Sequence, residues 1–184
     1  HEFRKNGFIV VPCSNLEGLK ELRKRFQKWV TEITDFDEDK NTDCNFFDNF
    51  HEKVFKNEIN EIRLKLYSRF NSENWSRPTV FSLAQPAIEA IVSNELVMQN
   101  RINVNIMMPN DEGSNQPVHI DAHSGESAFQ CVLWIPFSNA YDSKGIFLLP
   151  KDANRKAQND FKNWMAEGGQ NRVMNEIKDK VSSL

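Results

Sequence analysis

The hydrophobic period of the chain changes at Arg101, and this change restricts the possible folds more than any other feature. Before it, apolar residues recur every three or four positions, which is typical of amphipathic helices. After it, apolar residues stand at every second position, and side chains two apart share one face of a β-strand. The alternating residues are Ile102, Val104, Ile106 and Met108 against Arg101, Asn103, Asn105 and Met107. Helices followed by short strands predict an α+β domain with an antiparallel sheet or barrel core.

Three helices are expected before this change. The first covers about 15–34, where Ser14 and Glu17 have the spacing of a capping box. An acidic loop at 35–45 precedes a second helix, which ends at 71–78. Its apolar stripe consists of Phe50, Val54, Phe55, Ile59, Ile62, Leu66 and Phe70. Pro86 suits the first turn of a third helix.

Short β-strands are expected around these helices and after them. The β-branched run at 7–12 predicts an early strand closed by proline. The later strands are expected at 101–108, 117–122, 129–137 and 145–149. Turns at 110–115 and 124–127 and a loop at 139–144 connect them. From 154 onward a helix is expected, with a break at 168–169. We therefore expect one domain over residues 1–184, with mainly helical support in 1–100, sheet strands in 101–150 and a helical insertion in 151–184.

The charge and the cysteine content restrict the possible binding partners and the expected cellular compartment. The net charge is -3, whereas nucleic-acid and anionic-membrane partners require a concentrated basic surface. No apolar run approaches the roughly 18 residues of a membrane span, and no signal peptide is recognised. The three cysteines are Cys13, Cys44 and Cys131, which are too far apart for a metal knuckle. Reduced thiols in the cytoplasm are expected.

His119 and Asp121 carry the main chemical hypothesis. They stand two apart in a predicted strand, so both side chains point to one face. An imidazole nitrogen and a carboxylate oxygen supply two of the three ligands in the facial triad of iron(II) oxygenases. A surface histidine beside a solvated aspartate is the alternative interpretation of this short motif.

Four segments resemble the phytanoyl-CoA dioxygenase family of Fe(II)/2-oxoglutarate-dependent oxygenases. They are HIDAH at 119–123, QCVLWIPF at 130–137, GIFLLP at 145–150 and EFRKNGFIVVP at 2–12. The first three are similar, in order, to the family's metal-binding strand, its tryptophan-bearing strand and its Gly-to-Pro strand. The nearest resemblance is to a subgroup found in bacterial surface-carbohydrate gene clusters.

The resemblance implies a double-stranded β-helix (jelly-roll) core with helices packed on it, Fe(II) as cofactor and 2-oxoglutarate as cosubstrate. His119 and Asp121 would bind the iron, and Trp134 would border the 2-oxoglutarate pocket. Asn105 and Gln130 are further candidates for cosubstrate contacts. The implied reaction is hydroxylation of a small molecule, such as a sugar, a nucleotide-sugar or a lipid-linked intermediate.

The sequence departs from the family after Pro150. The family continues with a Gly-Ser/Thr-His element, and later with a distal histidine and an arginine, but residues 151–154 read KDAN and no histidine follows His123. His123 lies about 13 Å along an extended strand from His119, so it is expected to line the pocket or support a ligand. We expect a C-terminally truncated domain that is incomplete for catalysis and dimerises through unpaired sheet edges.

Two other functional classes remain open. A jelly-roll module that binds a small molecule or carbohydrate without redox chemistry would explain the missing third ligand. A cupin-type hydrolase or isomerase is disfavoured, because it needs additional histidines from neighbouring strands and the chain holds four histidines in all.

Overall fold

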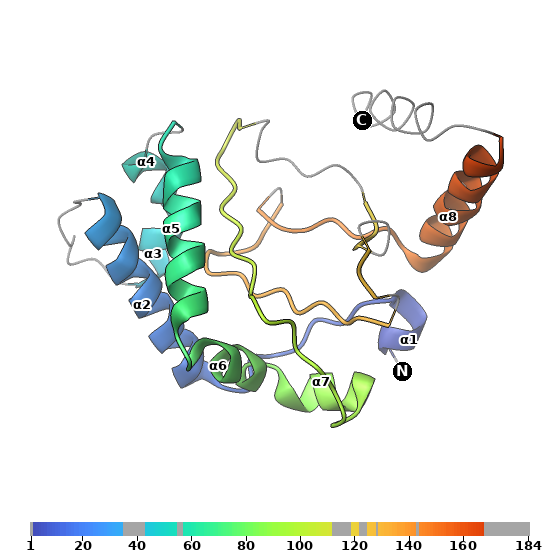
Figure 1. Ribbon diagram of the computed structural model, residues 1–184, viewed down its shortest axis with the longest axis horizontal. Helices are drawn as coiled ribbons and strands as arrows, with labels where there is room; N and C mark the ends of the chain where they lie inside the picture. The colour runs from blue at the N-terminus through green and yellow to red at the C-terminus, as the bar shows by residue number, and fades with distance from the viewer. Residues whose placement is uncertain are drawn as a thin grey trace. The chain divides into compact units, whose positions relative to one another are not determined.

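The computed structural model describes residues 2–34, 43–54, 57–111, 119–121, 125–127, 129–142 and 144–167. In these ranges the regular elements are helices, and none of the residues belongs to a β-strand (Figure 1). The helices are α1 Glu2–Asn6, α2 Leu16–Thr34, α3 Asp43–Asp48, α4 Phe50–Lys53, α5 Ile59–Ser72, α6 Ser76–Ser82, α7 Gln85–Val92 and α8 Lys151–Ala166. The expected α+β class is therefore wrong for the described part of the chain.

The chain divides into two compact units. The helical unit comprises Val11–Asn115 and Cys131–Gly145, and it contains α2 to α7. The motif unit comprises His1–Val10, Gln116–Gln130 and Ile146–Leu184, and it contains α1, α8 and the His119–Asp121 motif. No described helix is long and apolar enough to cross a membrane.

Helix α2 confirms the first predicted helix and begins at a side-chain cap. The Asn15 carboxamide oxygen accepts a hydrogen bond from the backbone N–H of Gly18 at 2.8 Å. This bond satisfies one of the N–H groups that every helix leaves unpaired at its start. The sequence pattern placed the cap at Ser14, whose backbone N–H instead donates to the carbonyl of Leu83 at 2.7 Å.

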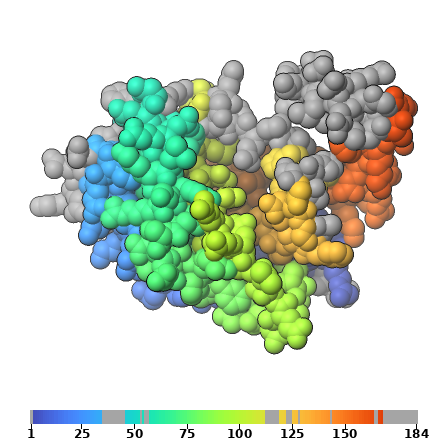
Figure 2. All heavy atoms as spheres, in the orientation of Figure 1, coloured from blue at the N-terminus to red at the C-terminus, as the bar shows by residue number. Residues whose placement is uncertain are grey.

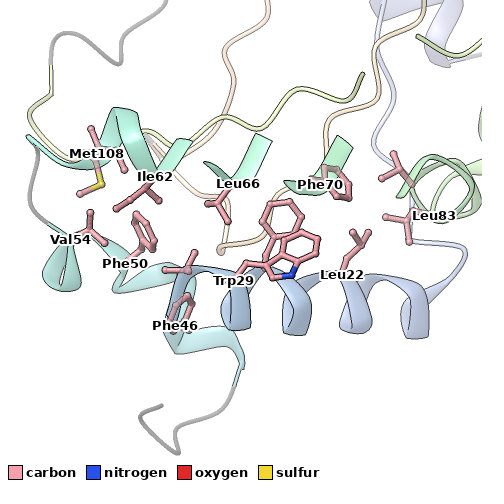
Figure 3. Close-up of a cluster of buried hydrophobic side chains, with 14 residues drawn as sticks. Leu22, Trp29, Phe46, Phe50, Val54, Ile62, Leu66, Phe70, Leu83 and Met108 are labelled. Atoms are coloured by element: carbon pink, nitrogen blue, oxygen red, sulfur yellow. The ribbon is translucent and has the colours of Figure 1, made fainter. Parts of the chain in front are cut away.

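The core of the helical unit is a helix-on-helix interface rather than a helix-covered sheet. Helices α2 and α5 supply most of it, and α6 and the short α3 and α4 close it (Figure 3). Phe26 of α2 lies at its centre, with ring centroids 4.9 Å from Phe70 and 5.0 Å from Phe137. The buried apolar set is Leu22, Phe26, Trp29, Val30, Phe46, Phe50, Val54, Ile59, Ile62, Leu66, Phe70, Val80, Leu83 and Met108.

The predicted second helix is divided into α4 and α5. The backbone of Val54 is extended (φ -127°, ψ 130°), which ends α4, and α5 begins at Ile59. The described residues of the predicted apolar stripe are nevertheless buried: Phe50, Val54, Ile59, Ile62, Leu66 and Phe70. Phe55 lies outside the described residues. The predicted end of this helix within 71–78 is confirmed, because α5 ends at Ser72. Pro78 lies in the first turn of α6, where backbone N–H groups have no intrahelical acceptor and proline is tolerated. Helix α7 confirms the third predicted helix, with Pro86 in its first turn.

The segment 102–108 shows why a period-two pattern did not become a strand. Burial alternates as predicted: Ile102, Val104, Ile106 and Met108 face the core, and the residues between them are exposed. The backbone, however, is paired with side chains of α5. Asn71 accepts from the N–H of Ile102 at 2.7 Å and donates to its carbonyl at 3.0 Å. Arg63 donates to the carbonyl of Ile106 at 2.9 Å. Helix side chains thus supply hydrogen bonds that a neighbouring strand would otherwise make.

The double-stranded β-helix core is contradicted in the remaining described segments as well. Residues 129–137 and 145–149 contain no strand, nor do the described residues of 117–122, which are 119–121. The predicted strand at 7–12 is also wrong: α1 ends at Asn6, Gly7 adopts φ +85°, and the residues after it are irregular. Several apolar side chains of these segments are exposed, and Phe129 has 94% of its surface in solvent. Ile135 and Phe137, in contrast, pack against the core of the helical unit. The C-terminal helical prediction is confirmed for α8, which begins at Lys151.

Asp48 tethers the loop at 139–144 to α3 within the helical unit. Its carboxylate accepts from the backbone N–H of Asn139 at 3.0 Å and from the Asn139 carboxamide at 2.6 Å. The Lys144 ammonium lies 3.5 Å from the same carboxylate. The Tyr141 hydroxyl, and to a smaller extent this carboxylate, raise the pKa of Lys144. One side chain therefore fixes both ends of the loop.

Replacing Asp48 by alanine is expected to release this loop and to speed trypsin cleavage after Lys144 about fivefold, the equivalent of about 1 kcal/mol. Cleavage of a folded chain requires local opening, and the tether opposes that opening. The rate can be followed by mass spectrometry under native conditions. Glu52→Ala, on the exposed face of α4, should leave the rate unchanged. Equal cleavage of Asp48→Ala and the unchanged chain would show that the tether does not hold the loop.

Candidate functional site

His119 and Asp121 lie close enough to act on one ligand. The Nε2 atom of His119 is 3.3 Å from the Oδ1 atom of Asp121, and the two side chains are 48% and 41% exposed. The geometry agrees with the predicted placement of both groups on one side of the chain, although the three described residues 119–121 form no strand. The pair is accessible to solvent and therefore to a small ligand.

The second oxygen of Asp121 has its own partner. The Gln130 carboxamide nitrogen donates to Oδ2 of Asp121 at 2.9 Å. The backbone N–H of Glu126 donates to the carbonyl of Asp121 at 3.4 Å, so the chain folds back on this residue before it reaches Gln130. Gly125 adopts φ +91°, a conformation that glycine adopts without steric cost. Within the motif unit, Asp121 thus has the His119 imidazole beside Oδ1 and the Gln130 carboxamide bonded to Oδ2.

The distance between Nε2 of His119 and Oδ1 of Asp121 would allow both atoms to bind one metal ion. Ligand nitrogen and oxygen atoms lie about 2.1 Å from a small divalent cation. Two such atoms at neighbouring coordination positions, about 90–105° apart, are separated by about 3.0–3.3 Å. The observed 3.3 Å lies at the upper end of this range. The pair can therefore act as a two-point chelate with little movement.

The described residues offer two candidate ligands in this pair and no third. Among them, no group of three or more histidine, cysteine, aspartate or glutamate side chains is arranged to hold a metal ion. His123, which the sequence suggested as a pocket-lining group, lies outside the described residues. A complete facial triad is therefore not present in the described part of the chain.

The other predicted site residues are distributed over both units. Gln130 belongs to the motif unit, and it contacts Asp121 directly. Trp134 and Asn105 belong to the helical unit. Trp134 is partly exposed, and Asn105 is exposed on the outer face of the segment 102–108.

Asn105 contributes to a shallow depression of about 280 Å³ in the helical unit. In Figure 2 the green surface of α5 adjoins the yellow-green surface of the segment that follows α7, and the depression is lined by residues of both. Its lining residues are Arg63, Leu64, Tyr67, Asn103, Val104 and Asn105. Arg63 is already engaged, because its guanidinium bonds Asn60 and the carbonyl of Ile106. We assign no function to this depression.

The direct contact between Gln130 and Asp121 was not anticipated from the sequence. Gln130 was predicted to contact the cosubstrate because it is a polar residue of a segment that was expected to form a strand at the barrel mouth. The sequence feature that could have indicated this contact is Gly125, which lies between Asp121 and Gln130. Glycine allows the chain to reverse direction within these nine residues. Such a turn brings a side chain at its end back to one at its beginning.

Cys131 follows Gln130, at the start of the second segment of the helical unit. Partial burial among neighbouring atoms raises the pKa of its thiol, because a thiolate is poorly solvated there. A raised pKa lowers the fraction of reactive thiolate near neutral pH. This direction of the pKa shift opposes thiolate activation, and we give Cys131 no catalytic role.

The pH profile of Cys131 alkylation tests this assignment. With iodoacetamide, the midpoint of the rate profile should lie at higher pH in the folded protein than in the urea-unfolded chain. Peptide mass spectrometry separates Cys131 from the other two cysteines. A midpoint at lower pH in the folded protein would indicate a stabilised thiolate and contradict the assignment.

Comparison with protein-family models, curated proteins and solved structures finds no match to this chain.

Proposed function

We propose that His119 and Asp121 are two ligands of a non-haem Fe(II) site in a 2-oxoglutarate-dependent dioxygenase that hydroxylates a small molecule, in the class of carbohydrates or lipid-linked intermediates. The observation that carries the proposal is the 3.3 Å separation of Nε2 of His119 and Oδ1 of Asp121, which matches two neighbouring positions on one ion. The resemblance of 119–123, 130–137 and 145–150 to oxygenase segments supports the choice of metal and cosubstrate. The proposal does not depend on a jelly-roll fold.

The chain's own groups would perform three tasks. The neutral imidazole of His119 would donate its Nε2 lone pair, and the carboxylate of Asp121 would offset one of the two positive charges. The exposure of both groups leaves room for a cosubstrate to approach from solvent. When bound, Fe(II) with 2-oxoglutarate supplies the oxygen activation that no side chain can provide.

Anaerobic titration tests this function. Fe(II) and then 2-oxoglutarate are added to the protein, and the weak visible charge-transfer band of the chelated cosubstrate is recorded. The band is expected with the unchanged chain and with His51→Ala, which alters an exposed histidine of α4. It should be lost in His119→Ala and in Asp121→Asn. No band with the unchanged chain, or a band that survives both substitutions, would contradict the proposal.

Replacing His119 by alanine is also expected to lower the affinity for metal while leaving the stability of the fold nearly unchanged. The Mn(II) dissociation constant should rise at least tenfold, because one of two protein ligands is lost. The free energy of unfolding should change by less than about 1 kcal/mol, because an exposed ion pair contributes little. Isothermal titration and urea denaturation measure the two effects. A loss of several kcal/mol would instead identify His119 as a structural hydrogen-bonding residue.

A second candidate is small-molecule binding without redox chemistry. The observation that favours it is the absence of a third metal ligand among the described residues. The His119–Asp121–Gln130 group would then bind a polyol or carbohydrate through hydrogen bonds alone. Binding of a sugar that persists in excess chelator, and depends on Asp121, would favour this candidate over the oxygenase.

A further inference from the structure

We infer that Gln130 is a positioning residue that restricts Asp121 to one metal-binding oxygen. The inference rests on the proposed function, since it concerns how the same site would hold its metal. The inference goes beyond the proposed function, because it assigns a role to a side chain that does not itself bind the ion. The key observation is that the two oxygens of Asp121 have different neighbours.

The geometry separates the two oxygens clearly. Oδ1 faces Nε2 of His119 at 3.3 Å, and Oδ2 accepts a hydrogen bond from the Gln130 carboxamide at 2.9 Å. A carboxylate that binds a metal through both oxygens must turn both towards the ion. With Oδ2 held by an N–H donor, Oδ1 alone is presented beside the imidazole. Asp121 would then occupy one coordination position instead of two, which leaves a position open for the cosubstrate.

The local backbone explains how Gln130 reaches Asp121. The N–H of Glu126 bonds the carbonyl of Asp121, and the N–H of Gln130 donates to the carbonyl of Ser127 at 3.2 Å. The Ser127 hydroxyl also accepts from the N–H of Phe129 at 3.2 Å. These bonds set the position of Gln130 relative to the carboxylate. This arrangement is similar to metal sites in which an outer partner orients a ligating carboxylate.

The side chain at this position must be a neutral donor of sufficient length. Asparagine is one methylene shorter and would not span the observed distance without movement of the turn. Glutamate has the length but places a second negative charge beside Asp121. Methionine matches the length and volume of glutamine and removes the N–H donor. Gln130→Met is therefore the most informative substitution.

The experiment compares Mn(II) binding by the unchanged chain and by Gln130→Met. Phe129→Ala, which removes a side chain that is 94% exposed, is the matched control in the same turn. The dissociation constant comes from isothermal titration. Metal-induced infrared difference spectra report the separation of the antisymmetric and symmetric carboxylate stretches, which is wide for one-oxygen and narrow for two-oxygen coordination. Subtraction of the Asp121→Asn spectrum isolates the signal of Asp121. Circular dichroism verifies that each variant is folded.

Gln130→Met is expected to bind Mn(II) about 10-fold more weakly or worse and to show the narrow separation. The unchanged chain and Phe129→Ala should show the wide separation. Equal affinity and an equally wide separation in Gln130→Met would overturn the inference and leave the proposed metal site intact. If the unchanged chain binds no Mn(II), or His119→Ala binds it equally well, the proposed function fails and the inference fails with it.

Discussion

Replacing Leu66 by alanine is expected to lower the free energy of unfolding by about 3–5 kcal/mol. Leu66 lies on α5 with 1% of its surface exposed, and it belongs to the buried cluster between α2 and α5. Truncation removes apolar contacts and leaves a cavity that a closely packed core closes only in part. Urea denaturation followed by circular dichroism at 222 nm measures the loss.

Leu64 provides the matched control for this substitution. It lies two residues away on the same helix and is 69% exposed, so Leu64→Ala should change the free energy of unfolding by less than about 0.5 kcal/mol. Both variants carry the same change in helix propensity. Comparable losses in the two variants would mean that α5 presents a different face to the core.

Replacing Asn71 by alanine is expected to cost about 2–3 kcal/mol. Its carboxamide makes two hydrogen bonds with the backbone of Ile102 and a third with the carbonyl of Tyr67 at 2.8 Å. Alanine leaves the partly buried N–H and carbonyl of Ile102 without this partner, and unpaired polar groups of that kind are costly. The segment 102–108 should therefore loosen from α5.

Amide hydrogen exchange resolves this effect at single residues. The N–H of Ile102 should exchange at least tenfold faster in Asn71→Ala. The change should be confined to the segment 102–108 and the end of α5. Asn103→Ala, on the exposed side of the same segment, serves as the control and should leave exchange at Ile102 unchanged. Unaltered protection of Ile102 in Asn71→Ala would show that another group secures this segment.

Helices α2, α5, α7 and α8 could be predicted because their signals are local. Helix α2 has an amphipathic stripe and a capping side chain next to its first turn, and Pro86 sets the start of α7. The boundary between α4 and α5 was missed because the apolar spacing continues across it. The described residues of the stripe are buried as predicted, although the helix is not continuous. Burial depends on which side of the chain faces the core.

The sheet was predicted wrongly because alternation reports burial rather than hydrogen-bond partners. Residues 102–108 alternate as expected, but any surface that covers one side of an extended segment produces that pattern. Here the cover is α5. Asn71 and Arg63, which pair with the backbone, are ordinary polar residues in the sequence of a helix. Nothing local distinguishes them from solvated side chains.

The candidate site was predictable in part for a related reason. His119 and Asp121 are two residues apart, so their proximity follows from local geometry. The contact with Gln130 spans nine residues and depends on the turn at Gly125. Whether Trp134 belongs to the same site depends on long-range placement, which the sequence motif does not encode.

The central claim is that His119 and Asp121 bind one divalent cation together, and paramagnetic broadening tests it most directly. Substoichiometric Mn(II) broadens the ring-proton resonances of the histidine that binds it. The chain has four histidines, and single substitutions assign their signals. We predict that His119 broadens before His51, and that Asp121→Asn abolishes this preference. Broadening of His51 at the same Mn(II) concentration, or a response of His119 that is unchanged in Asp121→Asn, would contradict the claim.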